Sequence, residues 1–173
     1  PMSTDGIDWR KAVGDIAWHV EREDYPAGQL ASLRRLQPAR PEGAAFWLLV
    51  NTHAPVALDN ERAERAVAIT INGMAIAHPF HRSPERRSLG FAMAEAEISE
   101  ARLLRLLRTD AEALPGEVRR LARLMGSKGD AGRFDWFDVF ALAYWPNDAI
   151  RRRIAKDYYR RQYNLQNPKG EAA

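Results

Sequence analysis

Hydrophobic residues recur every three or four positions along almost the whole chain, a spacing typical of one buried face of an α-helix. The first such stripe is formed by Trp9, Val13, Ile16, Ala17 and Val20. Prolines, glycines and polar residues separate it from the later helical stretches, which are AGQLASLRRL, PEGAAFWLLVNTHA, NERAERAVAITINGMAIA, LGFAMAEA, SEARLLRLLRTD, PGEVRRLARLMG, FDWFDVFALAYW and AIRRRIAKDYYRRQY. No pattern of paired strands accompanies them, so the sequence predicts an all-α fold of about nine helices.

Capping and breaking residues predict several helix boundaries. Pro41 suits the first turn of the third helix, and Asp59 suits the N-cap of the fourth, whose β-branched AVAITING portion we still expect to be helical. Asn147 or Asp148 can cap the last helix. Residues 77–88 contain two prolines and three arginines, which predicts an exposed loop. We expect two small bundles, comprising residues 1–96 and 97–173, that meet near residues 95–98.

Three predicted helices carry basic residues opposite their hydrophobic arcs. In residues 99–110, the apolar arc consists of Leu103, Leu104, Leu106 and Leu107. The last helix carries a basic stripe of Arg153, Lys156 and Arg160. Acidic residues at helical spacing are scarce on these faces, so the arginines are not simply partners in local ion pairs. The faces suit either contacts with phosphates or plain solvation. The candidate nucleic-acid-binding residues are Arg82, Arg86, Arg87, Arg102, Arg105, Arg108, Arg119, Arg120, Arg123 and Lys128.

The charge of the chain changes this picture only slightly. The net charge is +3, and it is uneven, since residues 1–96 contain 11 basic and 12 acidic residues whereas residues 97–173 contain 15 and 11. The excess of arginine over lysine fits either a polyanion partner or a GC-rich genome. Cysteine is absent, which suits a reducing cytoplasm and excludes a disulfide framework or a thiolate metal site.

Residues that could carry catalysis or bind a metal are few. His78 and His81 lack a carboxylate at ligand spacing, so we expect no metal there. Asp135 and Asp138 are interpreted as a capping and solvent-facing pair rather than as Mg²⁺ ligands. The sequence contains none of the common phosphate-loop, dinucleotide or nucleophile-elbow motifs, so we expect a protein that is not an enzyme and has no cofactor. Most tryptophans and tyrosines lie on apolar stripes, which favours core packing over base stacking.

The order of several motifs resembles the CasB family, the small subunit of the type I-E CRISPR Cascade surveillance complex. The similarity runs from about Leu30 to Tyr163, and the motifs are AFWLLV, RRSLGFAMA, SEARLLRLLRTD, LPGEVRRLARLM and FDWFDVFALAYW, followed by a basic helix. The segment SKGDAGR departs from the family pattern just before FDW.

This resemblance implies a non-catalytic, all-helical subunit of a cytoplasmic antiviral ribonucleoprotein complex. Its implied partners are the backbone and large Cascade subunits, crRNA, the target DNA strands and a second copy of itself, with no membrane. Its basic surface would bind the target and the displaced non-target strand without sequence preference and so stabilise the R-loop, while guide pairing supplies sequence specificity.

Two other functions remain compatible with the residues themselves. One is a helical protein-interaction adaptor without a nucleic-acid role, whose basic faces meet acidic protein surfaces. The other is a small DNA-binding regulator, although the turn at residues 109–116 is long for a helix-turn-helix and contains a proline.

Overall fold

The computed structural model describes residues 6–168, and the regular secondary structure of this part of the chain consists of helices, without a β-strand. The α-helices are α1 (Trp9–Glu21), α2 (Ala27–Arg34), α3 (Ala44–His53), α4 (Glu61–Ala77), α5 (Leu89–Glu95), α6 (Glu100–Arg108), α7 (Leu114–Ser127), α8 (Phe137–Tyr144) and α9 (Asp148–Gln166), and two 3₁₀ helices are η1 (Pro55–Asp59) and η2 (Gly129–Gly132). An isolated bridge joins Arg82 to Phe134. The predicted all-α fold is therefore confirmed.

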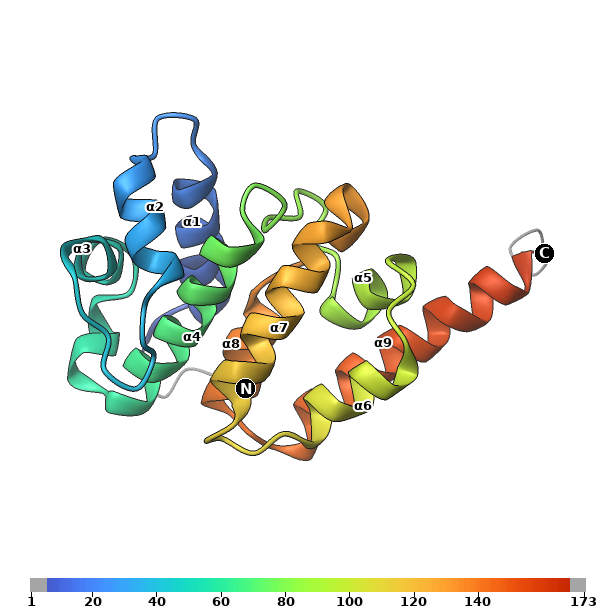
Figure 1. Ribbon diagram of the computed structural model, residues 1–173. Helices are drawn as coiled ribbons and strands as arrows, with labels where there is room; N and C mark the ends of the chain where they lie inside the picture. Colours follow the sequence, from blue (N-terminus) through green and yellow to red (C-terminus); the bar gives the residue numbers. More distant parts are fainter. Residues whose placement is uncertain (1–5, 169–173) are drawn as a thin grey trace.

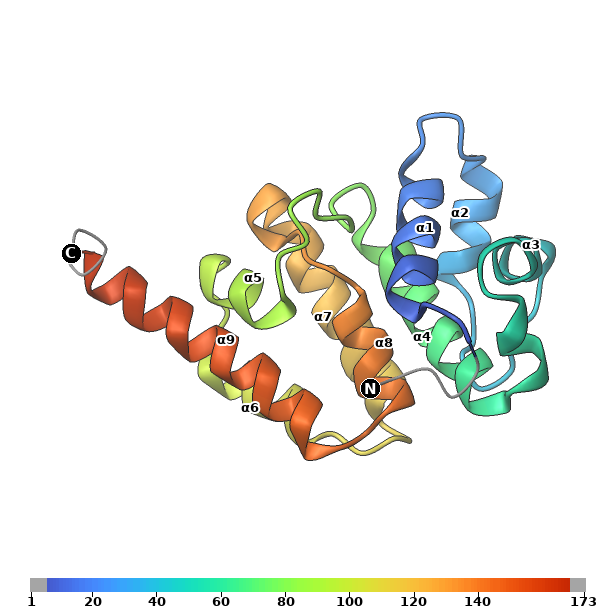
Figure 2. The same cartoon turned by 180° about the vertical axis from the view of Figure 1, so that it is seen from behind.

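Helix α4 lies at the centre of the larger part of the molecule. It is buried on almost every side, with α1, α2 and α3 packed against it from one direction and α7 and α8 from the other (Figures 1 and 2). Its β-branched portion is helical as predicted. The polar side chains within it are hydrogen-bonded, since Thr70 donates to the Ala66 carbonyl at 2.8 Å and Asn72 donates to the Leu33 carbonyl at 2.8 Å.

Helices α5 and α9 form a second packing centre (Figure 1). They approach so closely that a Cβ atom on Gly90 would lie 2.1 Å from the Ile154 carbonyl oxygen. The Tyr158 hydroxyl donates to the Ile98 carbonyl at 2.6 Å and ties α9 to the start of α6. The division of the chain at residues 95–98 stays a prediction. Helices from the two sides of this division pack on each other, since α7 and α8 contact α4, and α9 contacts α5.

Two predicted helix starts are wrong and one is right. The N-cap of α4 is Asn60 rather than Asp59, because the Asn60 side chain accepts from the backbone N–H of Ala63 at 3.1 Å. Helix α3 begins at Ala44, after Gly43, and not at Pro41. Asn147 caps α9 as predicted, accepting from the backbone N–H of Ile150 at 3.1 Å.

The segment 77–88 is not simply an exposed loop. His81 is completely buried, and its Nε2–H donates to the Ala17 carbonyl at 2.9 Å. Its own carbonyl accepts from the Trp136 indole at 2.6 Å. Burial lowers the pKa of His81 to about 4, so the imidazole is neutral. The segment is therefore fixed to α1 and to the start of α8.

Asp138 is buried rather than solvent-facing. Its carboxylate accepts from the backbone N–H of Leu89, the first residue of α5, at 2.7 Å, and from the Arg153 guanidinium at 2.5 Å. Asp135 accepts from the backbone N–H of Phe137, the first residue of α8, at 3.0 Å, and pairs with Arg10 at 2.5 Å. Both carboxylates thus have structural partners, and residues 6–168 hold no group of three or more His, Cys, Asp or Glu side chains arranged for a metal ion.

No helix within residues 6–168 combines the length and the hydropathy that crossing a membrane requires.

Candidate nucleic-acid interface

Helix α6 presents its arginines outward, as its sequence pattern predicts. Its buried residues are Leu103, Leu106 and Leu107, whereas Leu104 at the edge of the arc is only half-buried. Arg102 and Arg108 are exposed, and neither forms an ion pair with any residue of the described chain. These two guanidinium groups are free to meet an anion.

Arg105 shares a carboxylate with Arg120 across the groove between α6 and α7. Glu117 accepts from Arg105 Nε at 2.7 Å and from Arg120 Nη2 at 2.5 Å. The hydrogen bond from Arg120, reinforced by that from Arg105, lowers the pKa of Glu117 despite its partial desolvation. Glu117 is thus one of the scarce acidic partners on these faces, and the three residues keep one net positive charge.

Arg119 points into the structure and not out from the basic face of α7. Its Nε donates to the Asn72 side chain at 2.9 Å, and its Nη2 donates to the Leu36 carbonyl at 2.8 Å and to the Gln37 side chain at 3.4 Å. The guanidinium thus joins α7 to α4 and to the chain leaving α2. Its position at helical spacing from Arg123 gave no indication of this role.

Arg123 and Lys128 occupy the last part of α7 and the turn after it. Both are exposed, and no ion pair joins either of them to another residue in the part of the chain that the structure describes. The turn after α7 approaches the loop at residues 82–87, since the Asp130 carbonyl accepts from the Arg87 guanidinium at 3.4 Å.

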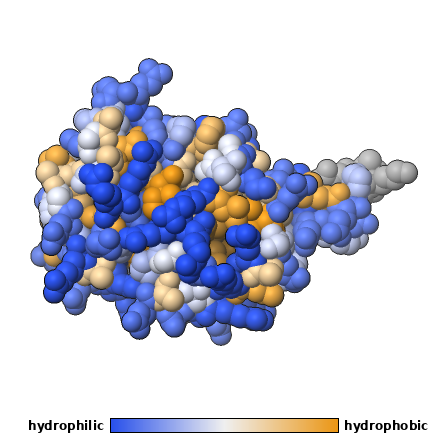
Figure 3. All heavy atoms as spheres, viewed as in Figure 1, coloured by the Kyte–Doolittle hydropathy of each residue, from blue (hydrophilic) through white to orange (hydrophobic). Residues whose placement is uncertain are grey.

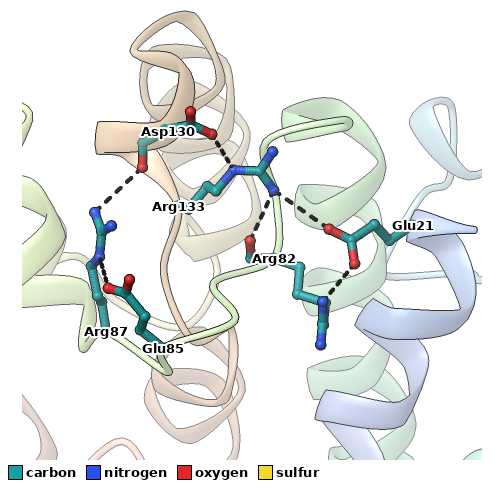
Figure 4. Close-up of polar contacts among 6 residues, drawn as sticks. All are labelled: Glu21, Arg82, Glu85, Arg87, Asp130 and Arg133. Atoms are coloured by element: carbon teal, nitrogen blue, oxygen red, sulfur yellow. Dashed lines mark hydrogen bonds and ion pairs between the residues drawn. The ribbon is translucent and has the colours of Figure 1, made fainter.

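Arg82 belongs to an ion-pair network between that loop and α1. Glu21 lies between the guanidinium groups of Arg82, at 2.7 Å, and Arg133, at 3.5 Å (Figure 4). Arg133 also pairs with Asp130 at 2.7 Å and donates to the Arg82 carbonyl at 3.1 Å. Arg82 therefore holds the loop in place, and its charge is largely compensated.

The guanidinium groups of Arg86 and Arg87, in the same loop, differ in whether they have partners. Arg87 pairs with Glu85 at 3.1 Å and reaches the Asp130 carbonyl at 3.4 Å (Figure 4). Arg86 is exposed with a left-handed backbone, φ 53°, and the described chain offers its guanidinium no partner. The loop thus contributes one exposed cation without an ion pair among the described residues.

The structure divides the ten candidates into three groups. Those that are exposed and without an ion pair among the described residues are Arg86, Arg102, Arg108, Arg123 and Lys128. Arg105 and Arg120 are exposed but share Glu117, while Arg82, Arg87 and Arg119 are held by structural contacts. Figure 3 shows hydrophilic side chains gathered over the face that carries α6 and α7, with an apolar area among them. Such a surface suits a phosphate backbone.

Residues 29–159 match the sequence profile of a family described as CRISPR-associated protein Cse2. The chain belongs to the Cse2 family. This finding confirms the predicted resemblance to CasB. A comparison with curated protein sequences finds no match.

Two solved structures share the fold of this Cse2 family member. The crystal structure of M. ruber CasB has a TM-score of 0.71 and 19% sequence identity, over 91% of this chain and 98% of that one. A chain in the crystal structure of E. coli Cascade bound to a PAM-containing double-stranded DNA target has a TM-score of 0.67 and 22% identity, over 87% of this chain and 95% of that one.

The basic stripe on α9 of this Cse2 protein differs from the predicted one by one residue. Arg153 turns toward the buried Asp138, whereas Arg152, Lys156 and Arg160 are exposed and recur every four residues. No ion pair joins these three to any other residue between 6 and 168. The four-residue spacing of 152, 156 and 160 was available in the sequence and would have identified the exposed row.

Proposed function

We propose that the chain is a non-catalytic subunit of a Cascade-type, CRISPR RNA-guided surveillance complex. Membership of the Cse2 family and the shared fold with a chain of E. coli Cascade bound to a double-stranded DNA target support this assignment. The other Cascade subunits, crRNA and target DNA are the corresponding partners, and a second copy of this chain is a further one.

Within that complex, the α6–α7 face binds nucleic-acid backbone without sequence preference and stabilises the R-loop. The observation that carries this proposal is the set of exposed, unpaired cations Arg102, Arg108 and Arg123 in the described chain. Because these guanidinium groups have no ion pair to break, they can neutralise phosphates directly, and this releases the counterions condensed on the nucleic acid. No base-reading arrangement is needed, because guide pairing supplies the sequence specificity.

Charge reversal at single positions tests the proposal in a reconstituted complex. Arg108→Glu and Arg123→Glu should each weaken retention of target DNA and lower the slope of log affinity against log salt by about 0.7–0.9 per lost phosphate contact. Arg62→Glu is the matched control, since Arg62 is exposed on α4, outside the proposed face, and its reversal changes the net charge equally. Equal weakening by all three variants would show a net-charge effect and refute the assigned face.

Glu117→Gln provides a test in the opposite direction. Removing this carboxylate frees the guanidinium groups of Arg105 and Arg120, so DNA retention should become stronger and its salt dependence steeper. If neither the reversals nor this change alters DNA retention while assembly and guide binding persist, the backbone-binding role is wrong. The protein-interaction adaptor would then be the better description.

A further inference from the structure

A cleft of about 240 Å³ opens beside α1, away from the α6–α7 groove. The segments 82–86 and 134–136 form its other walls, and Figure 2 shows the loop that contains the first of them alongside α1. The buried side chains that line it are the apolar Val13, Ala17, Phe134 and Trp136, together with Ser83. The cleft therefore combines an apolar base with a polar rim.

Trp18 stands at the rim of this cleft. It is 51% exposed, whereas the other four tryptophans, all within the described residues, are buried or partly buried. The Arg22 guanidinium lies over the indole ring at 5.5 Å. One turn earlier, Gly14 has no side chain, and apart from its chain neighbours and the adjacent backbone of α1, no atom lies within 4 Å of the position that its Cβ would take. An indole with open space beside it is a platform on which a planar ring can stack.

The rim also carries one uncompensated positive charge. Three of its cations are paired, Arg10 with Asp135 at 2.5 Å, Lys11 with Asp15 at 2.5 Å and Arg82 with Glu21 at 2.7 Å. Arg86 is the remaining lining cation and has no partner within residues 6–168. A turn fixes its backbone, since its N–H donates to the Ser83 carbonyl at 3.1 Å.

We propose that this cleft accepts one unpaired nucleobase of a bound nucleic-acid strand. The base stacks on Trp18 above the apolar floor, and the neighbouring phosphate pairs with Arg86. The volume is below the range of about 300–1,000 Å³ that is usual for drug-sized ligands, which fits a single base. Stacking tolerates any base, so the cleft adds affinity without sequence preference. This inference rests on the proposed function. It adds a contact with a base to the phosphate contacts already proposed for the α6–α7 face.

Two single-stranded DNAs of about 12 nucleotides distinguish base binding from phosphate binding. One strand consists of thymidines, and the other has the same backbone but is abasic throughout. At low salt, the full-length protein should bind the thymidine strand about 5- to 150-fold more tightly than the abasic strand. The thymidine strand should also quench the fluorescence of Trp18. Fluorescence anisotropy of labelled strands measures both affinities.

Two variants should abolish this preference for bases and leave the affinity for the abasic strand unchanged. Trp18→Ala removes the platform. Gly14→Leu fills the open space beside it, and because leucine is a much better helix former than glycine, we expect this variant to fold. Agreement between the two variants excludes a folding defect as the cause.

Other results would overturn the proposal. Equal affinity of the wild type for both strands would refute the base site and leave the proposed backbone binding intact. A preference for bases that survives in both variants would locate base binding elsewhere on the protein. Failure of both strands to bind at low salt would also refute the base site, whereas the proposed function is decided separately by DNA retention in the reconstituted complex.

Discussion

Replacing Arg119 with alanine should destabilise the protein, whereas the same change at Arg123 on this helix should have little effect. The Arg119 guanidinium donates at 2.9 Å to the Asn72 side chain and at 2.8 Å to the Leu36 carbonyl. Asn72 is only 1% exposed, so its side-chain oxygen would lose this partner with little access to water. Truncation therefore both removes favourable contacts and leaves a buried acceptor unsatisfied.

The magnitude follows from these two hydrogen bonds. A hydrogen bond from a charged donor contributes about 1.5–3 kcal/mol, and the lower value applies because Arg119 is only half-buried. The free energy of unfolding should thus fall by about 3 kcal/mol. For a chain of 173 residues this corresponds to a decrease in Tm of about 6–12 °C.

Thermal melting of three variants tests this reasoning. Arg123→Ala lies one turn later on the exposed face and should change the unfolding free energy by about 0.5 kcal/mol or less. Arg119→Lys should be intermediate, because an ammonium cannot match the fork geometry that contacts both Asn72 and Leu36. An Arg119→Ala protein that melts within about 2 °C of the wild type would contradict the structural role and return Arg119 to the exposed basic face.

Two further predictions concern packing and pH. Gly90→Ala should lower the free energy of unfolding by about 2–3 kcal/mol, because the new Cβ would lie 2.1 Å from the Ile154 carbonyl oxygen and 2.8 Å from the Tyr158 nitrogen. Gly14→Ala lies in open space and should instead raise this free energy by up to about 1 kcal/mol. Urea unfolding measures both changes. Because burial lowers the pKa of His81 to about 4, the unfolded state takes up a proton first as the pH falls. The contribution of the neutral imidazole to the free energy of unfolding is fully present above about pH 6.5. It falls by about 3 kcal/mol in total as the pH is lowered from there to about 4. His81→Gln should not show this additional loss. If the free energies of unfolding of the two proteins change in parallel with pH, the interpretation of His81 as a buried neutral imidazole is wrong.

The sequence alone predicted most of the helices, because amphipathic spacing is a local property. The leucine arc of α6 and the buried stripe of α1 follow directly from a repeat of 3.6 residues per turn. The exposure of Arg102, Arg108 and Arg123 follows from the same pattern, since residues opposite a buried arc face solvent. The motif order was also sufficient to indicate the family.

The tertiary structure decided which of the predicted cations are free. Arg119 has the helical position of a surface residue, yet its partners come from α4 and from the chain after α2. Glu117 compensates Arg105 because α6 and α7 lie side by side, and no spacing along one helix predicts a contact between two. His81 is buried in a segment whose composition is typical of an exposed loop.

The cleft beside α1 depends even more on tertiary contacts. Its walls come from three segments distant in the chain, and the exposure of Trp18 results from how those segments pack around it. Hydrophobic periodicity determines which face of each helix is buried, but which charges are paired and where a cavity remains depend on partners that only folding brings together.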